Sequence, residues 1–280
     1  MKLRLAVAAG TLAILVWQVG FGPFLDGLRT VDGDALAAAA GLAVLTTVCC
    51  AWRWQTVARG FGVELPLGTA VAAYYRSLFL NVTLPGGVVG DIHRGMTVGG
   101  LRAVAWERSA GQVVQIVLTV VVLLMLPSPV HGAAPFVAFG LVVAAAGVAL
   151  TARGRSWFAR DLRSGILTRR AWPAVVVASA LIVAGHTATF VIAAQTAGAT
   201  APPSELLPLA LLVLLAAALP NVGGWGPREG VTAWAFAAAG LGASRGVATA
   251  VVYGVMVFVA SLPGAAVLMT AWVRRGAAHA

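Results

Sequence analysis

Charged residues are scarce in this sequence, and that scarcity sets the class of the protein. They make up 10% of the 280 residues, whereas hydrophobic residues make up 60%. Soluble domains carry about 25% charged residues, so this composition excludes an ordinary soluble domain. Apolar runs near or above the roughly 18 residues that span a bilayer recur along the whole chain. The sequence therefore predicts an all-α polytopic membrane protein.

Cysteine and clustered metal ligands are also missing. The only cysteines, Cys49 and Cys50, are adjacent in an apolar run, which excludes a disulfide framework and a zinc site. The histidines are scattered without metal-ligand spacing: His93, His131, His186 and His279. The acids lack paired metal-binding spacing, and the serines show no partnered histidine and aspartate. We expect no metal, no cofactor and no catalytic residues, and hence no enzyme.

Acidic residues are few beside the basic ones, with 9 against 19, which gives a formal net charge of +10. In a soluble protein such an excess is typical of nucleic-acid binding, but no basic soluble domain is present here. In a membrane protein, basic residues mark the cytoplasmic side and contact anionic lipid headgroups. We expect membrane lipids as partners, no nucleic acid, and a location in the plasma (inner) membrane of a bacterial cell.

Eight apolar segments follow one another along the chain: 3–22, 34–52, 68–84, 107–126, 134–152, 173–197, 205–219 and 246–272. The first has the basic start of a signal peptide, but no small-x-small cleavage site follows it. We therefore interpret it as a retained span. Lys2 and Arg4 place the N-terminus in the cytoplasm by the positive-inside bias.

The arginines test whether all of these segments cross the membrane. If segment 68–84 crossed completely, the most basic loop of the chain would lie outside, against the positive-inside bias. This loop holds Arg153, Arg155, Arg160, Arg163, Arg169 and Arg170. If segment 68–84 instead enters from the cytoplasm, breaks at 85–87 and returns, the loop lies inside. The alternative is that the breaks are interfacial loops and the basic loop is an exception.

A second break, at 220–224, has the same solution, because segment 205–219 then enters from outside and returns outward. The result is about six transmembrane helices plus two re-entrant helical hairpins, with both termini cytoplasmic. Each half consists of two spans, a hairpin and a third span. Because each half crosses the membrane three times, the second half starts on the opposite side and is inverted relative to the first. We expect a single integral membrane domain over 1–280, with inverted repeats at about 1–128 and 129–275. Interrupted segments at matching positions indicate a transporter binding site.

The first break reads LPGGVVGDIHRG, residues 84–95. Pro85 is expected to end the entering helix, because proline cannot donate to the helical ladder. The glycines that permit tight turns with positive φ are Gly86, Gly87 and Gly90. The break is therefore predicted to be a hairpin tip.

Three polar residues surround this tip. Asp91 is predicted as the N-cap of the returning helix, whose free N–H groups favour an anion such as a lipid phosphate. Arg94 lies one turn on, where it either pairs with Asp91 or reaches that phosphate. Asn81 is expected to satisfy freed backbone groups. The alternative is that the charges pair only to hold the hairpin together.

The second break reads LPNVGGWGPREG, residues 219–230. Pro220 breaks the helix, Pro227 suits a first helical position, and Arg228 and Glu229 supply one charge of each sign. The turn is formed by Gly223, Gly224 and Gly226. Elsewhere, the adjacent charges 107 and 108 are interpreted as cytoplasmic rim charges.

The two breaks, in NVTLPGGVVGDIHR and PNVGGWGPRE, resemble the signature regions of the lysylphosphatidylglycerol synthase transmembrane, or flippase-like, family. The match in order and spacing covers roughly residues 50–270. Members are integral membrane proteins implicated in moving or handling lipids, and some carry a soluble domain that transfers lysine from tRNA to phosphatidylglycerol. Only RRGAAHA follows the last apolar segment, so we expect that domain to be absent.

The resemblance implies a substrate site formed by both motifs. Its residues are Asn81, Pro85, Gly86, Gly87, Gly90, Asp91 and Arg94 in the first motif, and Pro220, Gly223, Gly224, Gly226, Arg228 and Glu229 in the second. Arg94, Arg228 and the helix N-termini would hold phosphate. Asp91 and Glu229 would offset the charge or hold a cationic group.

These expectations favour a lipid flippase or translocator that moves a phospholipid or lipid-linked headgroup across the membrane. The tips would cradle a phosphate-bearing headgroup while the acyl chains stay in the bilayer. One alternative is a non-transporting accessory subunit with a lipid-synthesis enzyme as its partner. Another, less favoured, is a membrane enzyme acting on a lipid-linked substrate. The oligomeric state stays open.

Overall fold

The computed structural model describes residues 22–84, 87–126, 156–219 and 226–277, with isolated positions between 132 and 140. Every regular element in these ranges is a helix, as the sequence predicts. Four helical stretches are long and apolar enough to cross a membrane: Gly33–Gly60, Leu101–Met125, Ala171–Thr196 and Ala243–Thr270. The chain is thus a multi-pass membrane protein. The predicted segment 3–22 and most of 134–152 lie outside the described residues.

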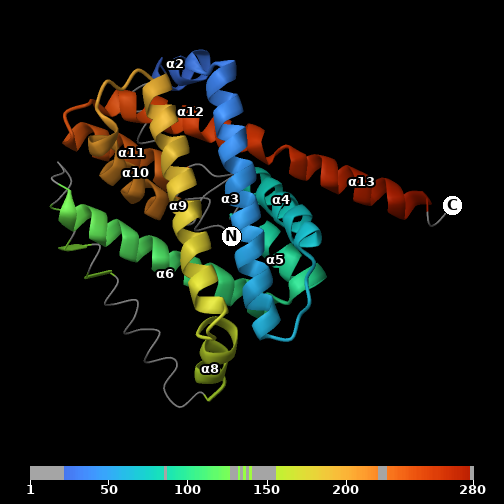
Figure 1. The fold of residues 1–280 in the computed structure, drawn as a ribbon. Coiled ribbons are helices and arrows are strands. Elements are labelled where there is room, and N and C mark those ends of the chain that lie inside the picture. The colour runs from blue at the N-terminus through green and yellow to red at the C-terminus, as the bar shows by residue number, and fades with distance from the viewer. Residues whose placement is uncertain are drawn as a thin grey trace.

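Two long helices form the centre of the molecule. α3 (Gly33–Gly60) and α9 (Ala171–Thr196) lie side by side and run in opposite directions (Figure 1). The Asp32 side chain starts α3 by accepting a hydrogen bond from the Ala35 N–H at 2.7 Å. The buried face of α3 includes several small apolar residues: Ala35, Ala39, Cys49, Ala51 and Ala58. Small side chains let helices approach closely inside a membrane.

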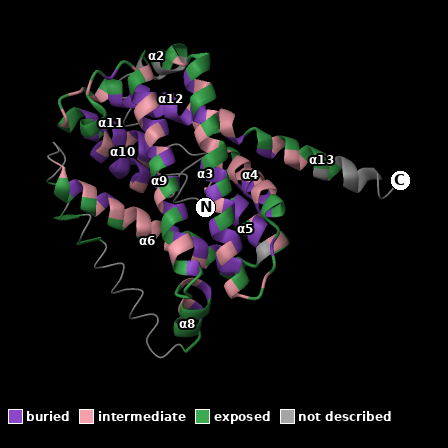
Figure 2. Ribbon diagram, viewed as in Figure 1, coloured by how far each residue is buried: buried purple, intermediate pink, exposed green. Residues whose placement is uncertain are grey.

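Two shorter pairs flank this centre, one on each side in Figure 1. The first is α4 (Leu67–Thr83) with α5 (Val89–Arg94), which continues into the π-helix η1 (Gly95–Gly99). The second is α10 (Pro203–Ala217) with α11 (Pro227–Ala238). α10 is hydrophobic all round and buried along most of its length (Figure 2), as expected for a helix enclosed by others.

Two further helices follow the pairs and connect them to the centre. α6 (Leu101–Met125) contacts α9 and α10, and α12 (Ala243–Ser261) contacts α3 and α4. α2 (Gly22–Thr30) packs on α12 at one end of the molecule. At the other end, α8 (Ser156–Asp161) and the π-helix η3 (Leu162–Ile166) lie beneath α3 and α9 (Figure 1).

The last predicted segment, 246–272, is split in the structure. α12 ends at Ser261, and α13 (Pro263–Ala277) begins after Leu262, packs on α4 and then extends away from the rest of the molecule (Figure 1). The cause is Pro263, which has no N–H to donate and therefore stands at the start of a helix. The other described segments match the predicted ones to within a few residues, with two exceptions: α3 continues to Gly60, beyond the predicted end at 52, and α6 begins at Leu101, before the predicted start at 107.

Candidate functional site

Five charged residues meet where α3, α5 and α6 come together. This charge cluster consists of Arg53, Asp91, Arg94, Glu107 and Arg108. Salt bridges connect all of its members in one chain, from Arg53 through Glu107, Arg94 and Asp91 to Arg108. Buried charges require such pairing, because an isolated ion in an apolar interior is strongly unfavourable.

Glu107 is the centre of the cluster. Its Oε1 accepts hydrogen bonds from Arg53 Nε at 2.8 Å, Arg53 Nη2 at 2.5 Å and the Tyr74 hydroxyl at 2.8 Å. Its Oε2 accepts one from Arg94 Nη2 at 2.7 Å. The side chain is fully buried. The interpretation of Glu107 as a cytoplasmic rim charge is therefore wrong: the carboxylate is buried because two guanidinium groups compensate its charge.

Arg53 reaches Glu107 through a gap that Gly111 leaves in α6. A Cβ at Gly111 would stand 2.3 Å from Arg53 Nη1, so a larger residue there would require the Arg53 guanidinium to shift. On its other side, Arg53 Nη1 donates to Ser179 Oγ of α9 at 2.9 Å. The arginine thus connects the central helix pair to α6.

Arg94 is fully buried and faces two aromatic rings. Its guanidinium carbon lies 4.1 Å from the centroid of Tyr74 and 4.6 Å from that of Trp54. Its Nε donates to Asp91 Oδ1 at 2.9 Å. These contacts are favourable for a desolvated cation. Of the two predicted roles of Arg94, pairing with Asp91 is the one that the structure contains.

The α4–α5 junction depends on Asn81. Its Oδ1 accepts the Gly90 N–H at 2.7 Å, so Asn81 satisfies a free backbone group of α5, as predicted. Asp91 is not the N-cap that the sequence predicts, because α5 begins two residues earlier and Val88 holds the capping position. A Cβ at Gly90 would stand 2.1 Å from the Ser77 carbonyl oxygen, so the two helices approach too closely for any other residue.

Asp91 instead binds four side chains at once. Its Oδ1 accepts from the Ser77 hydroxyl at 3.2 Å as well as from Arg94. Its Oδ2 accepts from Asn81 Nδ2 at 3.1 Å and from Arg108 Nη2 at 2.5 Å. Gly87, two residues before α5, has a positive φ of +65°, a conformation that glycine adopts without steric cost.

In the second motif, the two charged residues pair with each other. α11 begins at Pro227, as predicted, after Gly226 with a φ of +126°. Glu229 accepts the Gly226 N–H at 2.6 Å through Oε2, which caps the helix. Its Oε1 accepts from Arg228 Nε at 2.9 Å and Nη2 at 2.5 Å. Arg228 also lies over the ring of Tyr253, at 5.2 Å from its centroid.

Five predicted site residues lie outside the described residues: Pro85, Gly86, Pro220, Gly223 and Gly224. The structure therefore places the flanks of both motifs. Within those flanks, the first motif contributes to an open cavity and the second pairs internally.

A cavity of about 640 Å³ lies between the first motif, α6 and the end of α10. One part of its lining is polar and consists of Asp91, Arg108, Ser109 and Gln112. The rest is apolar and includes Val88, Ile92, Leu101, Val104 and Leu219. Residues 217–219 lead directly into the second break, so the cavity brings the first motif next to the approach to the second.

Arg108 is the cluster member most accessible from this cavity. Its side chain is 47% exposed, whereas that of Asp91 is 11% exposed. The sequence contained a signal for both Arg108 and Glu107, since ionisable residues within a membrane-spanning helix are functional candidates by default. Their proximity to the start of the apolar run led to the rim interpretation. Within the described residues, no group of three or more histidine, cysteine or acidic side chains is placed to hold a metal ion.

A separate polar contact connects α6 to α8. Asp161 accepts hydrogen bonds from Arg102 Nε at 2.6 Å and Trp106 Nε1 at 3.0 Å, and it forms an ion pair with Arg102. Burial raises the pKa of Asp161, but these two hydrogen bonds and the charge of Arg102 outweigh it and leave the pKa below its ordinary value.

Two comparisons with known proteins bear on the class of this protein. A search of curated proteins gives no significant match. The profile of a family described as "Lysylphosphatidylglycerol synthase TM region" matches residues 1–264 of the 280-residue chain. The match includes the charge cluster, the cavity and both glycine-rich motifs. The chain therefore belongs to the lysylphosphatidylglycerol synthase transmembrane family, whose members are membrane proteins related to lipid handling.

Proposed function

We propose that this protein is a lipid translocator and that it holds the headgroup in the cavity between α5, α6 and the end of α10. The observation that carries the proposal is the lining of that cavity, which combines one charged pole at Arg108 with apolar walls. A lipid has the same two-part chemistry. The volume of about 640 Å³ lies in the range typical of ligand sites. No catalytic residue is assigned in this proposal.

The proposal includes a re-entrant hairpin for α4 and α5. The hydrogen bonds between them show that the two segments run antiparallel, because residues further back along α4 contact residues further on after the break. They join Asn81 with Gly90, Ser77 with Asp91, and Arg76 with Thr97. Polar residues on the returning leg, such as Asp91 and Arg94, point to partners inside the protein. Non-helical backbone at membrane depth is tolerated only when it is enclosed in this way.

The proposal also includes an inverted repeat. Among eight of the helices, each contacting pair has a contacting counterpart when α3 exchanges with α9, α4 with α10, α5 with α11, and α6 with α12. For example, α4 contacts α12, and α10 contacts α6. Similarly, α2 packs on α12, and η3 packs on α6. Such a relation supports alternating access by movement of one half against the other.

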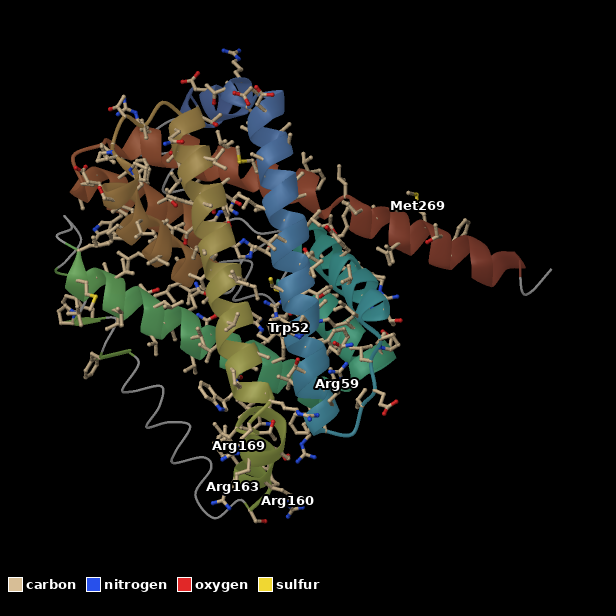
Figure 3. All side chains as sticks on the ribbon, viewed as in Figure 1. Trp52, Arg59, Arg160, Arg163, Arg169 and Met269 are labelled. Atoms are coloured by element: carbon tan, nitrogen blue, oxygen red, sulfur yellow. The ribbon has the colours of Figure 1, made fainter. Side chains whose placement is uncertain are left out.

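The orientation follows from the basic end of the molecule. Arg59, Arg160, Arg163 and Arg169 gather at the end formed by α8 and the close of α3 (Figure 3). By the positive-inside bias this end faces the cytoplasm. The α2 end, with Asp26, Asp32 and Asp34 near it, then faces outward. We place the protein in the plasma membrane with both termini cytoplasmic.

Filling the cavity tests the function without disturbing the charge cluster. Ala105 of α6 and Ala218 at the end of α10 both line the cavity, so Ala105→Trp and Ala218→Trp should each abolish transbilayer movement of fluorescent phospholipid in reconstituted vesicles. Ala38→Trp, on an exposed position of α3, is the matched control and should retain movement. Unchanged movement in both folded cavity variants would remove the site from the proposal.

The same assay addresses the accessory-subunit alternative. A translocator moves lipid when purified alone, whereas a subunit requires its partner enzyme. Absence of movement in the wild-type protein, together with co-purification of a stoichiometric partner, would replace the translocator proposal with this alternative.

A further inference from the structure

The carboxylate of Asp91 has no acceptor capacity left for a ligand. A carboxylate offers about four lone-pair sites. In this structure Ser77 and Arg94 donate to Oδ1, and Asn81 and Arg108 donate to Oδ2. Asp91 is the only acid among the described residues that line the cavity. A cationic headgroup would therefore find no free carboxylate oxygen there.

Two further acids, Glu107 on α6 and Glu229 in the second motif, are also engaged within the protein. Glu107 accepts from Arg53, Tyr74 and Arg94, and its side chain is fully buried. Glu229 accepts from Gly226 and Arg228 and is also fully buried. Among the described residues, these contacts favour the first of the two expected roles of Asp91 and Glu229, the offset of charge, over the binding of a cationic group. Both acids offset arginine charge.

Arg108, in contrast, has donors to spare. Within the described part of the chain, its only hydrogen bond is the one from Nη2 to Asp91. A guanidinium carries five N–H donors in a planar fork, and this one lies half exposed at the cavity. The charge cluster contains three arginines and two carboxylates, so it carries one surplus positive charge. An anion at Arg108 would neutralise that surplus.

We propose that the cavity selects lipids with a net anionic headgroup, whose phosphate binds Arg108, over lipids whose amine cancels the phosphate charge. The inference rests on the proposed translocator function and specifies its substrate class. Charge-assisted bonds from a guanidinium to phosphate are among the strongest hydrogen bonds in proteins. The apolar walls at Val88, Ile92 and Leu219 provide the surface against which acyl chains pack.

The test compares three fluorescent lipids in vesicles of otherwise identical composition. They are phosphatidylglycerol, which is anionic, phosphatidylethanolamine, which is zwitterionic, and lysylphosphatidylglycerol, which is cationic. We expect phosphatidylglycerol to move about tenfold faster than the other two, because their amines offset the phosphate charge that attracts Arg108. Faster movement of the cationic lipid, or equal rates for all three, would overturn the inference and leave the translocator function intact. No movement of any lipid would defeat the function itself.

Variants assign the selectivity to Arg108. Arg108→Gln should remove the preference, and Arg108→Lys should restore part of it, because lysine keeps the charge without the fork. Arg245→Gln, an exposed arginine on α12, is the control and should keep the preference. A preference that survives in folded Arg108→Gln protein would contradict the assignment.

Binding gives a readout that does not depend on movement. Native mass spectrometry should find phosphatidylglycerol retained by the wild-type protein and lost from Arg108→Gln. Soluble glycerol phosphate in excess should not displace it, because it lacks the chains that contact the apolar walls. Displacement by glycerol phosphate would show that the cavity binds a free phosphate compound instead of a lipid.

Discussion

Arg53 and Glu107 lie 54 residues apart in the sequence, yet two hydrogen bonds of 2.5 and 2.8 Å connect them inside the helix bundle. Each residue alone would be a strongly unfavourable buried charge. Together with Arg94 they form a network that holds α3, α5 and α6 in one arrangement. The cavity depends on this network, because Arg94 and Asp91 orient Arg108 at its edge.

Removing the carboxylate of Glu107 should destabilise the fold strongly. Glu107→Leu leaves Arg53 buried without a counter-charge and leaves Arg94 paired with Asp91 alone, and loss of a buried counter-charge costs about 3–5 kcal/mol. Arg53→Leu should cost a similar amount. The double variant should lose clearly less than the sum of both, because the two residues interact directly. Unfolding in detergent micelles measures all three, and additive losses would contradict the coupling.

The hydroxyl of Tyr74 contributes separately to this network. Tyr74→Phe removes the hydrogen bond to Glu107 but keeps the ring over Arg94. We expect a loss of about 1–2 kcal/mol in unfolding free energy. Tyr75→Phe, at the adjacent position, is the control and should change stability by less than about 0.5 kcal/mol. Equal effects of both substitutions would speak against a specific role for Tyr74.

The α4–α5 junction should not tolerate a methyl group at Gly90. In Gly90→Ala the new Cβ would collide with the Ser77 carbonyl oxygen, which lies 2.1 Å from its ideal position. The backbone must move apart, so we expect a destabilised protein with reduced lipid movement. Gly68→Ala on α4, where a Cβ meets nothing within 4 Å, should be neutral or slightly stabilising. A wild-type melting temperature for Gly90→Ala would refute the close packing.

The contact of Asp161 with Arg102 predicts a pH dependence. Because the pKa of Asp161 is lowered in the folded state, the contact contributes stability above the unfolded pKa of about 3.9. That contribution is lost as the pH falls through the lower, folded value. Wild-type protein should therefore exceed Asp161→Asn in melting temperature by a constant amount from pH 7 to 5. The gap should narrow below about pH 4, and a gap that widens in acid would reverse the assigned sign.

The re-entrant hairpin predicts which positions share a side of the membrane. In a background of Cys49→Ala and Cys50→Ser, the variants Thr97→Cys and Leu167→Cys should be labelled by a membrane-impermeant reagent from the cytoplasmic side. Ser244→Cys should be labelled from the outside. All three positions are exposed in the structure. Labelling of Thr97→Cys from the outside would show an ordinary crossing at segment 68–84 and would end the paired-hairpin proposal.

Several features of the fold could be predicted because they are local. Long apolar runs predict membrane helices, since the backbone must satisfy its own hydrogen bonds in lipid. Pro227 was correctly expected at the first position of α11, because a proline lacks an N–H that this position does not use. Asn81 was correctly expected to bind freed backbone groups, since it lies one helical turn from the break.

Other features could not be predicted because they depend on partners that are distant in the chain. Nothing beside Glu107 in the sequence shows that Arg53 and Tyr74 would enclose it, or that Gly111 would leave the space. Asp91 is not the predicted N-cap, because α5 begins at Val89. Asn81 of the neighbouring helix accepts the Gly90 N–H instead.

By itself, the sequence determined that this protein lies in a membrane, that it is helical and where its two breaks fall. Each of these features depends on residue chemistry over at most one helix length. Only the tertiary structure decided which charges are enclosed and which remains accessible. That difference depends on how many donors converge on each carboxylate, and other helices, in the case of Glu107 one 54 residues away, supply those donors.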